Sequence, residues 1–210
     1  MINALDIGTW MRRKTVTVLA PGPNGKPYWD KLRGLRIVVN KGVEIPTETD
    51  FWLVTDWWAL KTEWFYKHHD SYPGARIYSE GLVTKLPEYI EDPKMPHWFV
   101  KLVDGRDCVK PLGTGMYENV PGRLRPDGTV AGSAVELALK CGAAEIVLCG
   151  VDMEGDKYYD GDECISTTCD HQGEWAYTPY FNSLIRLAKE QGVDIWSMSK
   201  TTLDIEVRDG

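Results

Sequence analysis

Residues 127–155 constrain the fold of this chain more than any other stretch, because a helix pattern is followed at once by a strand pattern. Apolar residues repeat at the spacing of one helix face from Val130 to Cys141, and Gly142 marks the expected end of the helix. Residues 145–150 (EIVLCG) then form an almost continuous apolar run, which is typical of parallel strands buried on both faces. The stretch therefore predicts a helix packed on a buried parallel strand.

The rest of the chain repeats this alternation of strands and helices. Short apolar runs bounded by turn residues predict further strands at residues 14–20, 35–40, 51–55, 75–78, 97–103 and 193–198. Apolar spacing predicts a helix over residues 56–68 with Asp56 as its cap, and a last helix that opens at Thr178 and Pro179. The sequence PGPNGKP, at residues 21–27, is expected to be a loop without regular structure.

These elements place the chain in the α/β class. Strands that alternate with helices predict a single doubly wound, mostly parallel, Rossmann-like sheet with helices on both faces. The length of 210 residues suits one domain over residues 1–210, with long loops at 104–127 and 153–177. In the helix that precedes residues 145–150, Ser133, Glu136 and Lys140 are expected opposite the apolar stripe.

Composition and charge narrow the class of partner. The net charge of −7 argues against nucleic acid or an anionic membrane as the main partner. No apolar run is long enough to span a bilayer and residues 1–13 lack a signal-peptide core, so a cytoplasmic protein is expected. Cys164, Cys169 and His171 form a C-x4-C-x-H pattern that is not a zinc spacing, so no metal site is expected. Homo-oligomerisation stays open.

The candidate binding residues follow from the fold class. In a doubly wound sheet, ligands bind in the crevice beyond the carboxyl ends of the strands. The residues expected there, in chain order, are Gly22, Pro23, Asn24, Asn40, Lys41, Asp56, Gly128, Thr129, Gly132, Ser133, Gly150, Asp152, Tyr158 and Tyr159.

Each of these residues also has a purely structural explanation. Gly22 would let a ligand approach the backbone, or would only make a turn. Asn40 could bind a base edge or a sugar, or simply end a strand, and Lys41 could neutralise a phosphate. Asp56 is also a reasonable helix cap, and Asp152 could satisfy backbone groups in its own turn.

Several familiar catalytic signatures are missing from the sequence. There is no G-x-G-x-x-G, no P-loop, no G-x-S-x-G and no H-E-x-x-H. The sequence therefore disfavours hydride transfer, P-loop chemistry, serine hydrolysis and zinc proteolysis.

The arrangement of motifs resembles the bacterial family 42 sialyltransferases. It also resembles a related Rossmann-like group, the motility-accessory and pterin-pyrophosphokinase-like family. The resemblance is carried by Gly22-Pro23-Asn24 after the first strand, by Asn40 and Asp56, and by residues 128–134. Its most specific part is GAAEIVLCGVD at residues 142–152.

The resemblance implies a glycosyltransferase that uses a cytidine-linked sugar donor and a glycan acceptor, without a metal or other cofactor, in surface-glycan synthesis. It implies that Gly22, Asn40 and Thr129 contact the nucleotide or donor sugar. It further implies that Tyr158 and Tyr159 hold the phosphate. The family's general base, a histidine before the last helix, falls at His171 or a neighbour.

The sequence departs from the sialyltransferase pattern in three respects. Pro21 and Asp56 stand in place of asparagines, and the histidine is out of register, since a strict count to the last strand falls nearer Trp175. Two alternatives therefore stay open. One is a Mg²⁺-dependent pyrophosphokinase-like enzyme, with Asp56, Asp152 and Asp156 as ligands. The other is a nucleotide- or sugar-binding module without catalytic activity.

Overall fold

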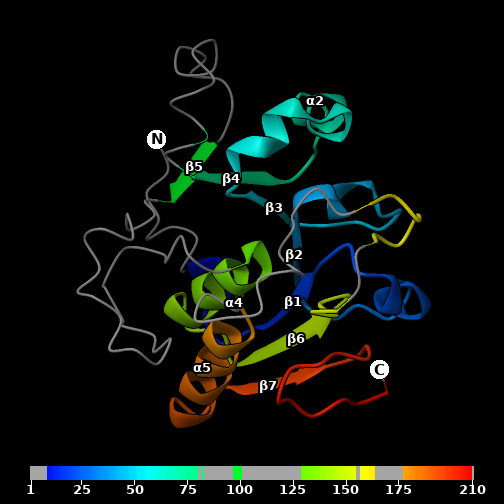
Figure 1. Ribbon diagram of the computed structural model, residues 1–210. Helices are drawn as coiled ribbons and strands as arrows, with labels where there is room; N and C mark the ends of the chain where they lie inside the picture. Colours follow the sequence, from blue (N-terminus) through cyan, green and yellow to red (C-terminus); the bar gives the residue numbers. More distant parts are fainter. Residues whose placement is uncertain are drawn as a thin grey trace.

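A single parallel sheet organises the protein, for which a computed structural model describes residues 9–79, 82, 97–100, 129–154, 157–163 and 177–209. The sheet has seven strands in the order β5-β4-β3-β2-β1-β6-β7 (Figure 1). The strands are β1 (Thr15–Leu19), β2 (Leu35–Val39), β3 (Phe51–Val54), β4 (Ala75–Ser79), β5 (His97–Val100), β6 (Glu145–Cys149) and β7 (Asp194–Ser197). All six strand pairings are parallel. The predicted α/β class and doubly wound sheet are confirmed.

The two faces of the sheet are covered differently. Helices α4 (Val130–Lys140) and α5 (Tyr177–Glu190) cover one face, where they meet side chains such as Val16 and Leu148. The other face carries the short helix α2 (Glu63–His69) over residues such as Trp52 and Cys149. Within the described ranges, the 3₁₀ helices are η1 (Pro23–Tyr28), η2 (Asn40–Glu44) and η3 (Trp57–Lys61). Alternate residues of β1, β2, β3, β4, β6 and β7 therefore enter two separate apolar clusters.

Two local predictions were wrong. The expected helix over residues 56–68 is broken at Thr62, whose backbone is extended (φ −114°, ψ 144°) and whose hydroxyl donates to Ala59 O at 2.6 Å. Asp56 precedes η3 but its side chain makes no capping hydrogen bond. The PGPNGKP stretch, expected to be irregular, enters η1. Proline is tolerated at the start of a helix because the N–H groups of the first turn have no partner within the helix, so the N–H that proline lacks is not missed.

Helix α4 is more deeply buried than its sequence pattern predicts. Ser133 and Glu136 were expected opposite the apolar stripe, yet each is only 1% exposed. Lys140 lies 2.7 Å from the Glu136 carboxylate, and the Tyr180 hydroxyl of α5 donates to the same group at 3.0 Å. Packing of α5 against this side of α4 thus turns an amphipathic helix into a buried one. Helix α5 itself begins at Tyr177, so Thr178 and Pro179 lie in its first turn.

The strand order creates the switch point at which a doubly wound sheet binds ligands. Strand β1 lies between β2 and β6, so the chain leaves β1 toward one side and later returns to its other side. The turn after α4 is tied to the start of β1, since Arg13 N–H donates to Gly142 O at 2.8 Å. The amino end of α4 therefore points to the edge where the parallel strands end, which we call the carboxyl edge. None of the described helices is long and apolar enough to cross a membrane.

Candidate functional site

The loops that follow β1 and β6 are locked together at the carboxyl edge. Gly22 N–H donates to Gly150 O at 3.0 Å, and Gly150 N–H donates to Ser199 Oγ at 2.9 Å. A Cβ atom on Gly22 would lie 2.3 Å from Gly150 O, and one on Gly150 would lie 2.3 Å from Ala20 O. The structure thus gives both predicted glycines a packing reason, which is that only glycine lets the two loops approach this closely.

Asp152 is the most unusual ionisable group of this junction. One carboxylate oxygen, Oδ2, accepts the backbone N–H of Asn24 at 2.9 Å, because Pro23 begins η1 and turns that N–H toward it. The other oxygen, Oδ1, is buried and has no hydrogen-bond partner in the described part of the chain. Burial raises the pKa of Asp152 to about 6, and the Asn24 N–H only partly opposes this. A buried carboxylate with a free acceptor oxygen is costly unless a ligand completes it.

Asn40 provides a second unpaired acceptor at the end of β2. Its backbone is left-handed (φ +46°), a conformation that asparagine tolerates better than most residues. Its amide donates to Asp56 Oδ2 at 3.3 Å, and its carbonyl oxygen accepts the Trp52 indole N–H at 3.0 Å. Its side-chain Oδ1 is buried and without a partner among the described residues. Burial raises the pKa of Asp56, while the bond from Asn40 lowers it.

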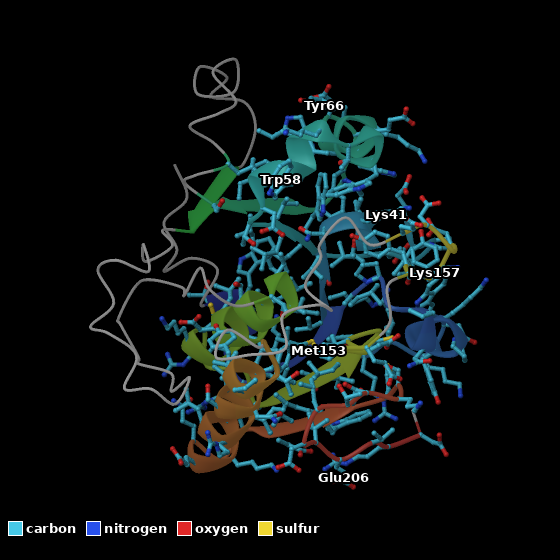
Figure 2. All side chains as sticks on the ribbon, in the orientation of Figure 1. Lys41, Trp58, Tyr66, Met153, Lys157 and Glu206 are labelled. Atoms are coloured by element: carbon cyan, nitrogen blue, oxygen red, sulfur yellow. The ribbon has the colours of Figure 1, made fainter. Side chains whose placement is uncertain are left out.

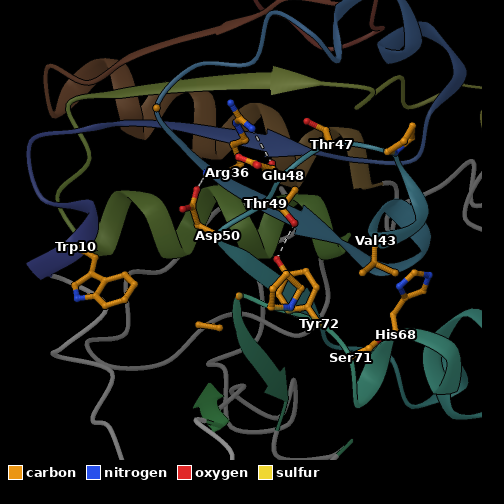
Figure 3. A pocket seen from close by; sticks show the side chains of 15 residues that line it. Trp10, Arg36, Val43, Thr47, Glu48, Thr49, Asp50, His68, Ser71 and Tyr72 are labelled. Carbon is orange, nitrogen blue, oxygen red and sulfur yellow. Dashed lines mark hydrogen bonds between the residues drawn. The ribbon is translucent and has the colours of Figure 1, made fainter.

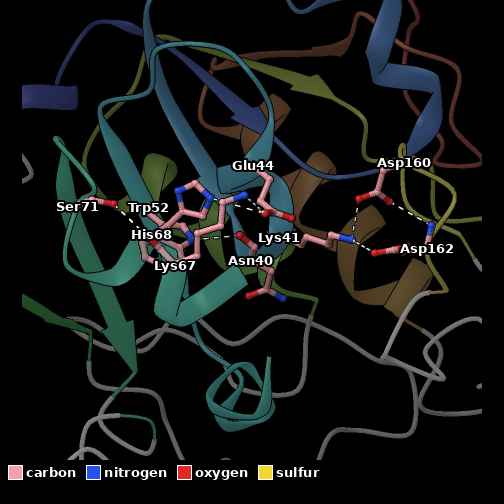
Figure 4. Close-up of polar contacts among 9 residues, drawn as sticks. All are labelled: Asn40, Lys41, Glu44, Trp52, Lys67, His68, Ser71, Asp160 and Asp162. Carbon is pink, nitrogen blue, oxygen red and sulfur yellow. Dashed lines mark hydrogen bonds and ion pairs between the residues drawn. The ribbon is translucent and has the colours of Figure 1, made fainter. Parts of the chain in front are cut away.

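Lys41 holds the loop of residues 157–163 against the sheet. Its side chain is 6% exposed, its Nζ lies 2.6 Å from Asp160 Oδ2, and it also bonds Asp162 (Figure 4). The same ammonium group lies 5.3 Å from the centre of the Tyr158 ring. Burial alone would lower the pKa of Lys41, but the two aspartates raise it overall. Its charge is therefore already neutralised, and binding a phosphate would require this cluster to open.

The remaining predicted residues at the start of α4 are used within the fold. Thr129 caps the helix, since its Oγ accepts the Gly132 N–H at 3.0 Å. A Cβ atom on Gly132 would lie 2.8 Å from the Tyr180 ring, so this glycine permits the contact between α4 and α5. Ser133 is buried beside them.

Tyr159 closes the loop over the end of β1. Its backbone N–H donates to Pro21 O at 2.9 Å, and its ring meets Trp29 edge to face. Gly128 and the expected base His171 lie outside the described residues, as do Cys164 and Cys169. Among the residues that are described, no three histidine, cysteine or acidic side chains gather as metal ligands.

Sequence reasoning missed the partners that organise this edge. Asp160 and Asp162 bind Lys41 across more than a hundred residues, and Ser199 receives the Gly150 N–H from beyond β7. The only sequence signal for the first was the acidic run DGDE directly after the two tyrosines. No local pattern pointed to Ser199.

Two cavities lie at opposite edges of the sheet. One, of about 480 Å³, opens beside the predicted residues; we call it the α2 cavity, and it is bounded in part by Lys41, Glu44, Lys61, Glu63, Trp64 and Tyr158. A larger one, of about 1070 Å³, lies where β2, β3 and β4 begin and is lined by residues such as Trp10, Asp50 and Tyr72 (Figure 3). None of the predicted site residues that the structure describes lines the larger cavity.

Lys41→Met is expected to release the 157–163 loop without unfolding the sheet. Methionine fills a similar volume but leaves Asp160 and Asp162, which are more exposed than Lys41, repelling each other. Amide hydrogen exchange should accelerate at Tyr158 and Tyr159, whose N–H groups donate to Asp162 O within the loop and to Pro21 O after β1. Lys200→Met, which removes an exposed ion pair with Glu154, is the matched control and should leave these amides unchanged. Equal protection in both variants would contradict the role assigned to Lys41.

Comparison with known proteins finds the same fold in bacterial sialyltransferases. No family model and no curated protein sequence matches the chain. Among solved structures, it is similar to the sialyltransferase CstII from Campylobacter jejuni in complex with the substrate analogue CMP-3FNeuAc. That match has a TM-score of 0.57 and 16% identity, and it covers 92% of this chain and 86% of that one.

A second similar structure is the monofunctional alpha-2,3-sialyltransferase Cst-I from Campylobacter jejuni, with a TM-score of 0.52 and 14% identity over 94% of this chain and 82% of that one. CstII in complex with a trisaccharide acceptor and CMP matches with a TM-score of 0.52 and 16% identity, over 89% and 81% of the two chains. The chain therefore has a sialyltransferase-like fold across most of its length.

Proposed function

We propose that this protein is a sialyltransferase-like glycosyltransferase that binds a cytidine-linked sugar donor at the carboxyl edge, between the loops after β1 and β6. It would transfer the sugar to a glycan acceptor in surface-glycan synthesis, without a metal. The observation that carries the proposal is the pair of buried acceptor oxygens on Asn40 and Asp152 that find no hydrogen-bond partner within the described part of the chain. Both follow strands that flank or adjoin the switch point, where a fold of this type binds its ligand.

These two oxygens favour a ligand that brings hydrogen-bond donors. A buried acceptor without a partner costs about 1–3 kcal/mol, which a hydroxyl or amino group of a ligand would recover. A nucleotide sugar carries such donors on its base, its ribose and its sugar. The fold that the chain shares with proteins solved in complex with CMP and CMP-3FNeuAc favours cytidine among the bases.

The proposed reaction is a displacement at the anomeric carbon of the donor sugar. An acceptor hydroxyl oxygen forms the new bond to that carbon, the bond to the phosphate oxygen breaks, and CMP leaves. The hydroxyl proton passes to a general base, for which His171 is the proposed residue.

The proposal is tested by calorimetric titration with CMP, UMP and AMP, in the presence of EDTA and then of Mg²⁺. We expect CMP to bind in EDTA and to bind more tightly than the other two nucleotides. If none of the three nucleotides binds at millimolar concentration, the proposal is wrong. Binding that requires Mg²⁺ would instead support the pyrophosphokinase-like alternative.

A further inference from the structure

The segment that follows β7, residues 199–202, forms a third wall beside the loops after β1 and β6. Ser199 Oγ accepts the Gly150 N–H at 2.9 Å, and Thr202 N–H donates to Asp152 O at 3.2 Å. The segment is therefore bound to the turn that carries the Asp152 oxygen for which no described residue provides a donor. It lies at the carboxyl edge, as the two loops do, because it directly follows a parallel strand.

Lys200 lies in the middle of this wall. Its carbonyl oxygen accepts the side-chain amide of Asn24 at 3.3 Å, and the backbone N–H of Asn24 donates to Asp152. Its ammonium lies 3.3 Å from Glu154 Oε1, two residues beyond Asp152. Burial raises the pKa of Asp152, and the positive charge of Lys200 is one of the effects that lower it. The backbone of Lys200 is thus fixed at the junction, while its charge sits at the end of a flexible side chain.

The partner of this ammonium group is easily exchanged. Lys200 is 77% exposed and Glu154 is 41% exposed, and exposed ion pairs of this kind contribute little to stability. Lys41, by contrast, is buried and held by two aspartates, and Figure 2 shows it well apart from Met153, the residue after Asp152. Lys200 can therefore leave Glu154 for an anion of a ligand at little cost.

A cation beside Asp152 has a physical reason when the ligand is a nucleotide. The phosphate of the donor is negative, so the carboxylate of Asp152 would repel it. The hydroxyls of Tyr158 and Tyr159, to which the resemblance assigns the phosphate, donate hydrogen bonds but bring no positive charge. An ammonium group supplies that charge, and its hydrogen bonds to an anion are stronger than those between neutral groups.

We propose that Lys200 binds the phosphate of the donor nucleotide, exchanging Glu154 for it, and that Glu154 holds the lysine while the site is empty. This inference rests on the proposed function, because the phosphate is that of the cytidine-linked donor. In the proposed reaction Lys200 also faces the negative charge that CMP carries as it leaves.

The test is an NMR titration of the full chain with CMP, cytidine and inorganic phosphate, in which the amide shifts of residues 199–202 report binding. Lys200→Met removes the ammonium but keeps the carbonyl oxygen that binds Asn24, and Lys200→Arg keeps the charge. Glu154→Gln releases Lys200 from its carboxylate partner. Lys189→Met, at the exposed end of α5, is the matched control, because it changes the net charge by the same amount.

We expect Lys200→Met to bind CMP about threefold to tenfold more weakly than the wild type, and Glu154→Gln to bind it about twofold more tightly. Lys200→Arg and Lys189→Met should match the wild type. Cytidine, which has no phosphate, should bind equally to all of these proteins. Added salt should weaken CMP binding less in Lys200→Met than in the wild type, because the screened contact is already absent.

The inference is overturned if Lys200→Met binds CMP as tightly as Lys189→Met. It is also overturned if Lys200→Met loses cytidine as strongly as CMP, since the lysine would then only support the shape of the wall. If CMP and cytidine both fail to bind the wild type, the proposed function is wrong and inorganic phosphate decides the inference. Phosphate that binds the wild type but not Lys200→Met would leave an anion site at Lys200 standing, and any other result with phosphate would overturn it.

Discussion

Gly150→Ala is expected to destabilise the fold by about 2–5 kcal/mol, a large part of the stability of an ordinary domain. Gly150 has a φ of +70°, which an alanine adopts only with strain. The added Cβ would also lie 2.3 Å from Ala20 O, a backbone atom that cannot rotate away. The loops after β1 and β6 would have to separate, and the crevice between them would lose its shape.

Gly192→Ala is the matched control for this variant. Gly192 has an almost identical φ of +71°, but no atom of the described residues lies within 4 Å of the position of its Cβ. Gly192→Ala should therefore lower the free energy of unfolding only by the cost of a left-handed backbone conformation, about 1–2 kcal/mol. Urea unfolding followed by tryptophan fluorescence measures both variants. Equal decreases in the free energy of unfolding would show that the close contact between the two loops is not what restricts this position to glycine.

The sheet could be predicted from sequence because its strands are buried on both faces. Residues 145–149 are apolar almost without interruption, and a parallel central strand is the structure in which such a run is stable. The alternation of these runs with helix patterns then fixed the α/β class. Because the carboxyl ends of parallel strands meet at one edge, Gly22 and Asn24 were expected close to Gly150 and Asp152. The structure confirms this proximity, since Gly22 N–H donates to Gly150 O and Asn24 N–H donates to Asp152.

The parts that sequence did not predict depend on contacts between distant segments. Thr62 interrupts the predicted helix because its hydroxyl and its backbone N–H both donate to Ala59 O. The spacing of apolar residues does not predict these hydrogen bonds. Glu136 looks like a solvent-facing partner of Lys140 until α5 brings Tyr180 against it. Charge patterns along one helix cannot reveal burial by another element.

The same limit applies to the candidate site. Sequence could place Lys41 at the end of a strand, but its pairing with Asp160 and Asp162 follows from the path of a later loop. It could name Asn40 and Asp152, but not that each keeps one buried oxygen that no described residue pairs. Whether a hydrogen-bond donor reaches these oxygens depends on how distant segments pack around them, and only the folded chain determines that packing.

Asp152→Asn is expected to raise the stability of the fold at pH 8 and to weaken nucleotide binding at the same time. Burial raises the pKa of Asp152 from its ordinary value of 3.8 to about 6, so the folded state holds this proton more tightly than the unfolded state. The resulting stabilisation is complete below pH 3.8 and is lost as the pH rises through about 6. Above that, the buried charge costs up to about 3 kcal/mol, at about 1.4 kcal/mol for each pH unit between the two values.

Asparagine removes this cost and keeps an oxygen for the Asn24 N–H, but it replaces the free acceptor with an N–H donor. A ligand group that donates to Asp152 Oδ1 would then face another donor. The affinity for CMP should therefore fall by about tenfold or more. Urea unfolding between pH 4 and 8 should show a gain in stability that grows with pH, and Asp204→Asn, at an exposed carboxyl, should show none. A gain in stability with unchanged CMP binding would mean that the unpaired oxygen of Asp152 does not contact the nucleotide. A gain in stability combined with lost binding would identify Asp152 as a residue whose cost to the fold is retained because the ligand needs its acceptor oxygen.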